Sequence, residues 1–346
     1  MTMVEKTQIL LIYTGGTIGM VLDTESNALK PFDFDNLYNS IPVLANMNCC
    51  INIYSFDQLI DSSNVNPDFW IKLAGVIKEN YEKYDGFVVL HGTDTMAYSA
   101  SALSFMLENL NKPVVFTGSQ LPLGMVRTDG RENFINAIEI ASAQTDNAPI
   151  VPEVVIYFEN RLFRGNRTNK FNAENFDAFL SGNYPPLAEV GVHIRYNEAY
   201  IQKPNFKKLK VHKKLDSNVA ILKLFPGITE KVVRSMIEVE GLRALILETY
   251  GAGNAPTDVW LIKALKYAIE QKDLIIFNVT QCKGGSVEIG KYETSIELGK
   301  IGVVGGYDIT TESAIAKLMY LLGSGYTKKE IERLLQIPLR GEMSII

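Results

Sequence analysis

The sequence predicts an α/β protein with two domains: a doubly wound, mainly parallel sheet in the N-terminal domain and a smaller α/β domain after it. The first observation is a repeated alternation of short apolar runs with amphipathic segments of helical spacing. The second is a single interruption of that alternation by a lysine-rich stretch, after which it resumes. Apolar strands that alternate with helices are typical of parallel sheets covered on both faces.

The N-terminal part of the chain supplies strands and helices in turn. Its short apolar runs are predicted to be buried strands at 8–14, 86–90, 113–117 and 154–158. Segments with helical spacing are predicted to be helices at 67–84, 95–110 and 129–145. The first of these helices has the clearest start, because Asn66 can cap it and Pro67 suits the first helical position.

A change of composition over residues 197–216 marks the predicted domain boundary. Lysines crowd this stretch around Pro204: Lys203, Lys207, Lys208, Lys210, Lys213 and Lys214. A solvated linker or exposed strand explains them; the alternative, a nucleic-acid-binding arm, lacks interleaved aromatic residues and a supporting motif. We therefore expect an N-terminal catalytic domain at 1–196, a linker at 197–216 and a C-terminal domain at 217–346. The last contains predicted strands at 219–225, 244–247 and 274–279, and predicted helices at 229–240, 258–271, 311–322 and 328–336.

Composition narrows the class of protein. Of the 346 residues, 47% are hydrophobic and 21% charged, as in ordinary globular proteins. The formal net charge of -5 argues against a nucleic-acid partner, which usually requires a strong basic field. Cys49, Cys50 and Cys282 fit neither a disulfide framework nor zinc-ligand spacing. We see no secretory signal and no apolar run of membrane-spanning length, so we expect a cytoplasmic protein without membrane contact.

Two strand ends carry the residues that suggest chemistry. One apolar run ends in Thr14-Gly15-Gly16-Thr17, and another ends in His91-Gly92-Thr93-Asp94-Thr95. Because such strand ends line the ligand crevice of an open α/β sheet, we expect Thr14, Thr93 and Asp94 to meet at one site. The structural alternatives are a glycine-rich turn that cradles a phosphate and a helix N-cap at Asp94. The phosphate signatures fail, however, since Walker and dinucleotide spacings are absent.

A threonine nucleophile needs a base that takes its proton. His91, His193 and His212 give poor support for a Ser-His-Asp triad, because their sequence contexts suggest structural or exposed positions. A lysine can serve instead where burial lowers its pKa. The segment 161–170 is crowded with cations, and it is compatible with such a base or with a solvated basic loop. The residues alone do not choose which cation enters the site.

The paired motifs at 14–19 and 91–95 resemble the two signature motifs of the bacterial-type L-asparaginases, and the likeness is closest to the cytoplasmic type I branch. It continues through 61–63, 117–120, 164–167, 250–256, 305–308 and 339–342, so it covers nearly the whole chain. The resemblance implies an asparagine amidohydrolase of asparagine catabolism. Such a hydrolase converts L-asparagine to L-aspartate and ammonia through a threonine acyl-enzyme, without a metal or an organic cofactor.

The resemblance also implies roles for individual positions. Thr14 matches the attacking threonine, Thr93 and Lys170 match the proton relay, and Asp94 matches the group that binds the substrate's ammonium. Which threonine attacks first is not decided by the sequence.

Further positions match substrate-binding residues of the family: Ser62 and Ser63 at the α-carboxylate, Gly92 through its backbone, and Ser119 at the scissile amide. The family forms homodimers, often paired into homotetramers, in which a neighbouring copy borders the site. Tyr250 and Asn254 are the candidates for that border.

This chain departs from the family pattern at two places: the flexible loop that closes over the site as a lid, and the site at which some members bind an activating asparagine. The family's lid tyrosine aligns with Ala28, so we name no lid residue. Some type I enzymes bind an activating asparagine next to an arginine and a threonine, and this chain has Glu248 and Asn169 there. Because a carboxylate would repel the effector's carboxylate, we expect no activation of that kind.

Two alternative functions are compatible with these motifs. One is the tRNA-dependent amidotransferase subunit, which normally has an extra N-terminal domain, whereas here the first motif starts at Thr14. The other is a sensor that binds asparagine or aspartate without turnover, which the intact Thr14, Thr93, Asp94 and Lys170 set disfavours. The preference between asparagine and glutamine stays open, since one methylene is worth only about 1–3 kcal/mol in a pocket.

Overall fold

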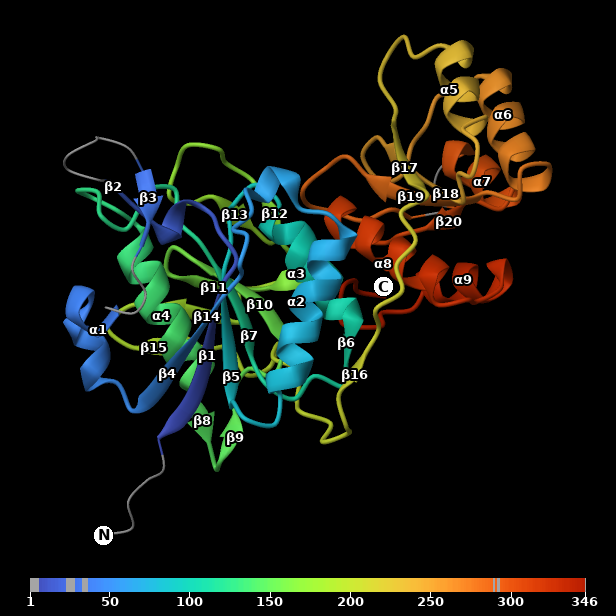
Figure 1. Cartoon of the computed structure of the whole chain (residues 1–346). Coiled ribbons are helices and arrows are strands. Elements are labelled where there is room, and N and C mark those ends of the chain that lie inside the picture. The colour runs from blue at the N-terminus through green and yellow to red at the C-terminus, as the bar shows by residue number, and fades with distance from the viewer. Residues whose placement is uncertain (1–5, 23–28, 33–36, 289, 291–292, 346) are drawn as a thin grey trace. The chain divides into compact units, whose positions relative to one another are not determined.

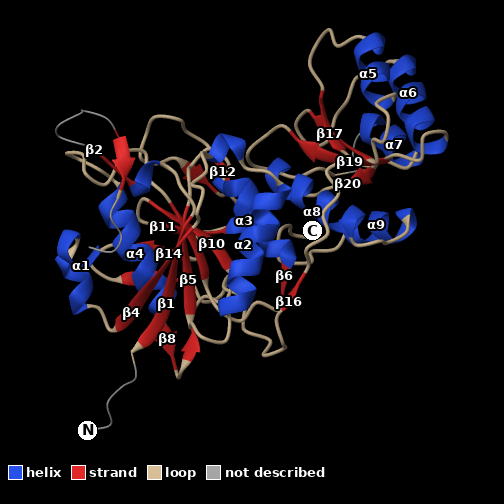
Figure 2. Cartoon of the chain, viewed as in Figure 1, coloured by secondary structure: helices blue, strands red, loops and turns tan. Residues whose placement is uncertain are grey.

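The computed structural model describes residues 6–22, 29–32, 37–288, 290 and 293–345. The chain divides into two compact units, each with its own sheet (Figures 1 and 2). The first unit comprises Met1–Ser181 and Pro185–Val211, and the second comprises Gly182–Tyr184 and His212–Ile346. Each unit is an α/β structure, as the sequence predicts.

The first unit is built on a mixed sheet with the strand order β15-β14-β11-β10-β7-β5-β1-β4. Its parallel strands are β1 (Thr7–Tyr13), β4 (Cys49–Ser55), β5 (Gly86–Leu90), β7 (Val114–Thr117) and β10 (Val154–Phe158). An antiparallel extension consists of β11 (Arg161–Arg164), β14 (Ala188–Val190) and β15 (Ile194–Tyr196). The mainly parallel sheet is confirmed, whereas β4 and the antiparallel extension were not predicted.

The order of the strands places a switch point beside β1. From β1 the chain passes to β4 on one side and then crosses to β5 on the other, which is the double winding that the sequence predicts. In the parallel register Tyr13 of β1 lies opposite Leu90 of β5. The two motifs therefore start side by side at the carboxyl edge, where open α/β sheets bind their ligands.

Helices cover both faces of this sheet (Figure 1). Helices α2 (Pro67–Asn80) and α3 (Met96–Met106) lie on one face, and α4 (Gly130–Ser142) lies on the other. The Asn66 side chain caps α2 by accepting a hydrogen bond from Phe69 N at 3.1 Å, and Pro67 opens the helix, as predicted. A four-residue helix, α1 (Leu37–Ser40), precedes β4.

Short strand pairs complete the first unit. They are β2 (Met20–Leu22) with β3 (Leu29–Pro31), β8 (Gln144–Thr145) with β9 (Ala148–Pro149), β12 (Asn169–Lys170) with β13 (Phe179–Leu180), and β6 (Leu107–Glu108) with β16 (Lys210–Val211). The last pair ties the lysine-rich stretch to the end of α3, and Lys210 lies 3.6 Å from Glu108. The other lysines of that stretch are exposed, as a solvated segment requires.

The second unit has a parallel sheet with the order β17-β18-β19-β20. Its strands are β17 (Val219–Lys223), β18 (Ala244–Thr249), β19 (Ile275–Thr280) and β20 (Val304–Gly305). Its helices are α5 (Glu230–Ile237), α6 (Val259–Glu270), α7 (Glu293–Lys300), α8 (Thr311–Gly323) and α9 (Lys328–Leu335). A continuous apolar core joins the sheet to α5 and α6. Within the described ranges, no helix is long and apolar enough to cross a membrane.

Candidate active site

A pocket of about 380 Å³ opens at the carboxyl edge of the first unit's sheet. The segments that follow neighbouring strands line it, together with residues in and after β12. Its lining consists of Gly15, Gly16, Thr17, Met20, Leu59, Ile60, Asp61, Ser62, Gly92, Thr93, Asp94, Gln120, Lys170 and Ala173. Both sequence motifs therefore contribute to one cavity of a size that suits a small, polar ligand.

Glycines let the two motifs approach each other. The backbone of Gly15 and Gly16 has φ angles of 126° and 88°, which favour glycine over residues with a side chain. A Cβ atom on Gly16 would lie 2.5 Å from the backbone nitrogen of Gly92. The first turn can therefore pack directly against the second only when position 16 carries no side chain.

The structure does not support Thr14 as the nucleophile. Its side chain is 1% exposed, and its hydroxyl donates a hydrogen bond to the carbonyl oxygen of Leu90 at 2.8 Å. Its backbone nitrogen also donates to that oxygen, so Thr14 continues the contact between β1 and β5. It does not line the pocket. A nucleophile must reach the substrate, and this hydroxyl instead joins two strand ends.

Thr17 lines the pocket from the same motif. It begins the short 3-10 helix η1 (Thr17–Gly19), directly after the glycine turn, and its side chain is half-buried. Tyr13 anchors this turn from below, because its buried hydroxyl donates to Gly19 O at 2.9 Å, and burial raises the pKa of Tyr13 to about 12. Thr17 was not predicted as a site residue, although the motif contains a threonine on each side of the glycine pair.

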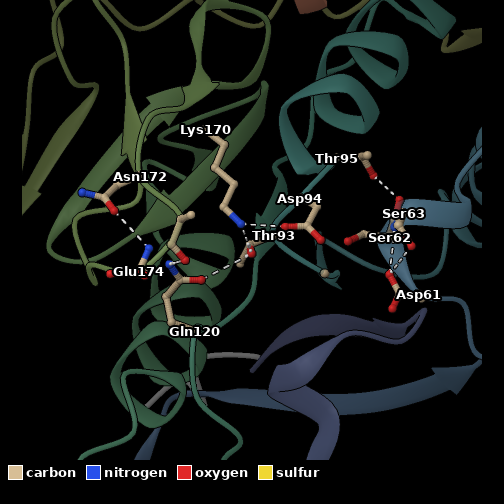
Figure 3. Close-up of polar contacts among 12 residues, drawn as sticks. Asp61, Ser62, Ser63, Thr93, Asp94, Thr95, Gln120, Lys170, Asn172 and Glu174 are labelled. Atoms are coloured by element: carbon tan, nitrogen blue, oxygen red, sulfur yellow. Dashed lines mark hydrogen bonds and ion pairs between the residues drawn. The ribbon is translucent and has the colours of Figure 1, made fainter.

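Thr93, Asp94 and Lys170, which also line the pocket, come together in one cluster (Figure 3). Lys170 Nζ donates to Thr93 Oγ1 at 2.8 Å and to Asp94 Oδ1 at 2.7 Å. The lysine side chain is 18% exposed and the aspartate side chain is 62% exposed. The alternative role of Asp94 as a helix cap is not seen, since Thr95 is the N-cap of α3 and makes no side-chain cap.

The cationic segment before Lys170 is buried from Leu162 onward, whereas its first cation, Arg161, is exposed. It follows β11 as the 3-10 helix η5 (Gly165–Arg167), and Arg164 and Arg167 are both buried. Arg164 Nε lies 2.6 Å from Glu153 Oε2, and its Nη2 lies 3.2 Å from Glu153 Oε1. This two-point contact fixes the segment. Of the cations left open by the sequence, Lys170 is the one that lines the pocket.

The two serines after β4, Ser62 and Ser63, point their side chains to different places. Ser62 lines the pocket and packs against Gly92, where an added Cβ would meet Ser62 Oγ at 2.5 Å. Ser63 does not line it; its hydroxyl donates to Asp61 Oδ1 at 2.8 Å. Hydrogen bonds from the Ser63 backbone and hydroxyl hold the pKa of Asp61 below its ordinary value. Asp61 also lines the pocket and adds a carboxylate to its wall, which was not predicted.

The Ser119 side chain also lies outside the pocket. Its hydroxyl donates to Leu121 O at 2.6 Å, and the residue is buried. The next residue, Gln120, lines the pocket instead and places its Oε1 atom 3.4 Å from Thr93 Oγ1. Both residues follow β7 (Val114–Thr117) in an irregular segment, where no strand or helix period says which side chain enters the cavity.

His91 is buried beneath the second motif, as the sequence context suggests. Gly92 O can only accept, so His91 Nδ1 carries the hydrogen and donates to it at 2.7 Å. Nε2 of the neutral ring then accepts from Ser99 Oγ at 2.9 Å, and Ser99 Oγ accepts from Trp70 Nε1 at 2.9 Å. Burial lowers the pKa of His91 to about 4, which keeps the ring neutral. This chain of bonds supports the backbone of Gly92.

The remaining predicted positions lie elsewhere. Tyr250 and Asn254 belong to the second unit, where backbone hydrogen bonds of 2.8 and 2.9 Å join them across a tight turn. Glu248, also in that unit, accepts from Thr311 Oγ1 at 2.7 Å, and Asn169 is buried next to Lys170 in the first unit. Ala28 lies outside the described residues.

An α/β sheet that gathers hydroxyls, a lysine and carboxylates at its carboxyl edge defines a hydrolase-type site of the nucleophilic class. Among the residues that the structure describes, no group of three histidine, cysteine, aspartate or glutamate side chains could hold a metal ion. The chemistry available here comes from the hydroxyls, the ammonium and the carboxylates.

Comparisons with known proteins agree with this class. The family described as "Asparaginase, N-terminal" matches residues 8–202, and "Glutaminase/Asparaginase C-terminal domain" matches residues 218–335. The chain is 41% identical over 341 residues to L-asparaginase 1 of Escherichia coli strain K12, covering 98% of this chain and 99% of that protein. The chain therefore belongs to the asparaginase family.

Two further relatives show the breadth of the family. The crystal structure of L-asparaginase I from Vibrio cholerae matches with a TM-score of 0.88 at 41% identity, covering 98% of this chain and all of that one. A protein named 60 kDa lysophospholipase from Mus musculus is 39% identical over 363 residues, which cover 98% of this chain and 63% of that protein.

Proposed function

We propose that this pocket hydrolyses the side-chain amide of L-asparagine to give L-aspartate and ammonia. The observation that carries the proposal is the contact of one lysine with a threonine hydroxyl and a carboxylate at 2.8 and 2.7 Å, on the wall of a cavity of about 380 Å³. The cavity walls offer both signs of charge, which an amino acid substrate requires for its ammonium and carboxylate. The relatives named as L-asparaginases support the same reaction.

Thr17 is the proposed nucleophile. Its hydroxyl oxygen attacks the side-chain carbonyl carbon, the C–N bond breaks, and the amide nitrogen leaves as ammonia. Water then attacks the resulting ester, the C–O bond to Thr17 breaks, and aspartate leaves. Support comes from the position of Thr17 on the pocket wall, within the motif that the family resemblance connects with attack. Backbone N–H groups of the two motifs are candidates for the oxyanion site.

Thr93 and Lys170 form the proposed proton relay. A neutral lysine accepts the proton that Thr93 passes from the attacking hydroxyl, and the ammonium then returns it toward the leaving nitrogen. Asp94 is the proposed partner of the substrate's ammonium, since one of its oxygens is held by Lys170 and the side chain is largely exposed. Ser62 and the backbone of Gly92 are the proposed contacts of the α-carboxylate side of the substrate.

Assembly and location rest on the family resemblance. We propose a homo-oligomer, a dimer or a dimer of dimers, in which Tyr250 and Asn254 of a neighbouring copy border the pocket. The cytoplasm is the proposed location.

The direct test is ammonia release by the purified protein from asparagine, with glutamine and a lysophospholipid as comparison substrates. We expect turnover of asparagine over a wide concentration range with a hyperbolic rate curve. Fatty acid release from the lysophospholipid without ammonia release from asparagine would overturn the proposal. A sigmoidal curve with asparagine would contradict the expectation that Glu248 prevents activation.

A matched pair of valine variants tests the nucleophile. Thr17→Val removes one hydroxyl at nearly constant shape, and we expect it to abolish acyl-enzyme formation. Thr14→Val should retain turnover and lose about 1 kcal/mol of unfolding free energy with its hydrogen bond to Leu90. Intact-protein mass spectrometry during turnover reports the ester. An active Thr17→Val together with an inactive, folded Thr14→Val would restore Thr14 as the nucleophile.

A further inference from the structure

Gln120 is held in one orientation by the loop opposite it (Figure 3). Its Nε2 atom donates to Ala173 O at 3.2 Å and to Asn175 O at 3.0 Å. Its backbone nitrogen donates to the Asp129 carboxylate at 2.9 Å. Because both amide hydrogens are engaged by carbonyl oxygens, the amide cannot flip without losing two bonds. The atom that faces Thr93 is therefore Oε1, which only accepts hydrogen bonds.

This orientation fixes the direction of the hydrogen bonds at Thr93. The Lys170 ammonium has three hydrogens and no lone pair, so Thr93 Oγ1 accepts from it at 2.8 Å. The single hydrogen of Thr93 then points to Gln120 Oε1 at 3.4 Å, a long and weak contact. The chain of bonds runs from lysine to threonine to glutamine. A relay that passes a proton to Lys170 needs the opposite direction at Thr93.

We infer that Gln120 is a positioning residue that holds the Thr93 hydroxyl in its resting orientation and so favours the charged form of Lys170. This inference rests on the proposed relay of Thr93 and Lys170. When Lys170 is neutral, its lone pair competes with Gln120 Oε1 for the threonine hydrogen. Gln120 thereby stabilises the ammonium form relative to the neutral form that accepts a proton.

Among the described residues that line the pocket or contact Gln120, the other charged groups around the relay are carboxylates. Asp94 contacts Lys170 directly, Asp61 lines the same pocket, and Asp129 holds the backbone of Gln120. His91 lies beneath the second motif and stays neutral above about pH 4. These groups keep their positions in variants of the Gln120 side chain. A change in the protonation of Lys170 in such variants is therefore assigned to the amide.

A purely structural role is the competing explanation. Gln120 also fastens the loop at 173–175, whose turn is closed by Asn172 Oδ1 accepting from Glu174 N at 3.0 Å and Asn175 N at 3.1 Å. Gln120→Glu is the control for loss of loop order, because it loses both donors to the loop, as Gln120→Met does, but keeps an oxygen that can accept from Thr93.

The test measures the neutral fraction of Lys170 directly. Acetic anhydride reacts with the neutral amine, and peptide mass spectrometry gives the extent of labelling at each pH, with exposed Lys203 as the internal standard. In Gln120→Met, we expect the labelling of Lys170 to begin about 0.4 pH unit lower, the low end for the loss of one hydrogen bond because the contact is long. The acid limb of kcat/KM for asparagine should move by the same amount. In Gln120→Glu, the added charge should move both to higher pH.

The outcomes separate the hypotheses. An unchanged or higher labelling pH in Gln120→Met overturns the inference, as does an equal downward shift in Gln120→Glu, which also loses both bonds to the loop but keeps an acceptor for Thr93. Labelling does not require turnover, so failure of the wild-type protein to release ammonia would reject the proposed function while the labelling still tests Gln120. A fall in kcat without any shift in pH profile would leave Gln120 with only a structural role.

Discussion

Each unit contains a lysine that lies 2.7 Å from a carboxylate, and the two pairs differ in everything around that contact. Lys170 and Asp94 have side-chain exposures of 18% and 62%, and the lysine also reaches the hydroxyl of Thr93. Lys317 of α8 and Glu342 in the C-terminal segment are 0% exposed. The same chemical pair therefore occurs once at the edge of a pocket and once inside a core.

The partners explain how the two pairs differ in what they can do. Lys317 also donates to Leu335 O and Ile337 O, and Glu342 accepts from the backbone nitrogens of Leu339 and Arg340. Every group there has a fixed partner, which ties α8 to the C-terminal segment. Lys170 instead contacts a hydroxyl that can reverse its hydrogen bond. The sealed pair, Lys317 and Glu342, has all its hydrogen bonds satisfied and stabilises the fold. The open pair, Lys170 and Asp94, lies next to a hydroxyl and can take part in proton transfer.

Removal of the open lysine should have the largest effect. We expect Lys170→Met to lower kcat/KM for asparagine by about 10³-fold or more, as in other dismantled nucleophile–base units. Its unfolding free energy should change little, because the site is partly exposed. Steady-state kinetics and urea unfolding of the same preparation check both statements. Near wild-type kinetics would mean that the base lies elsewhere.

Removal of charge from the sealed pair should affect stability instead. We expect Glu342→Gln to lower the unfolding free energy by about 3–5 kcal/mol, because the Lys317 ammonium stays buried without a counter-charge. The control is Glu230→Gln, which breaks the exposed pair of Glu230 and Arg234 and should cost about 0.5 kcal/mol or less. Equal urea midpoints for the two variants would contradict the contrast between sealed and exposed pairs.

The smallest effect should come from the exposed carboxylate of the open pair. We expect Asp94→Asn to raise KM for asparagine by about fivefold, equivalent to about 1 kcal/mol, because solvent screens a largely exposed charge. Added salt should shrink the difference in KM between wild type and variant. A salt-independent loss of several hundredfold would show that substrate binding buries Asp94.

Local signals were sufficient for most of the fold. Apolar runs followed by glycine marked β1 and β5, and the Asn66-Pro67 pair marked the start of α2. β4 was missed because its strand is only partly buried, so its pattern lacks a continuous apolar run. The antiparallel extension was missed because its strands are three or four residues long.

The site was harder to predict, because the motif does not say which hydroxyl faces the cavity. The positive φ angles of Gly15 and Gly16 turn the chain, so Thr14 remains against β5 while Thr17 reaches the pocket. The same limitation applies after β7. Ser119 was predicted to contact the substrate, but its hydroxyl bonds to Leu121 O, and the next residue, Gln120, lines the pocket instead. The burial of Arg164 depends on Glu153, and no local pattern reveals that pair.

The contact between Gly16 and Gly92 has a consequence for how this pocket tolerates change. Main chain meets main chain there, so the separation of the two loops is set by peptide atoms and cannot be adjusted by repacking rotamers. Substitutions in the surrounding core can alter stability without altering the width of the cavity at this point. An L-residue at position 16 acts as a wedge, and a compensating change would have to rebuild the loop at Gly92 as well.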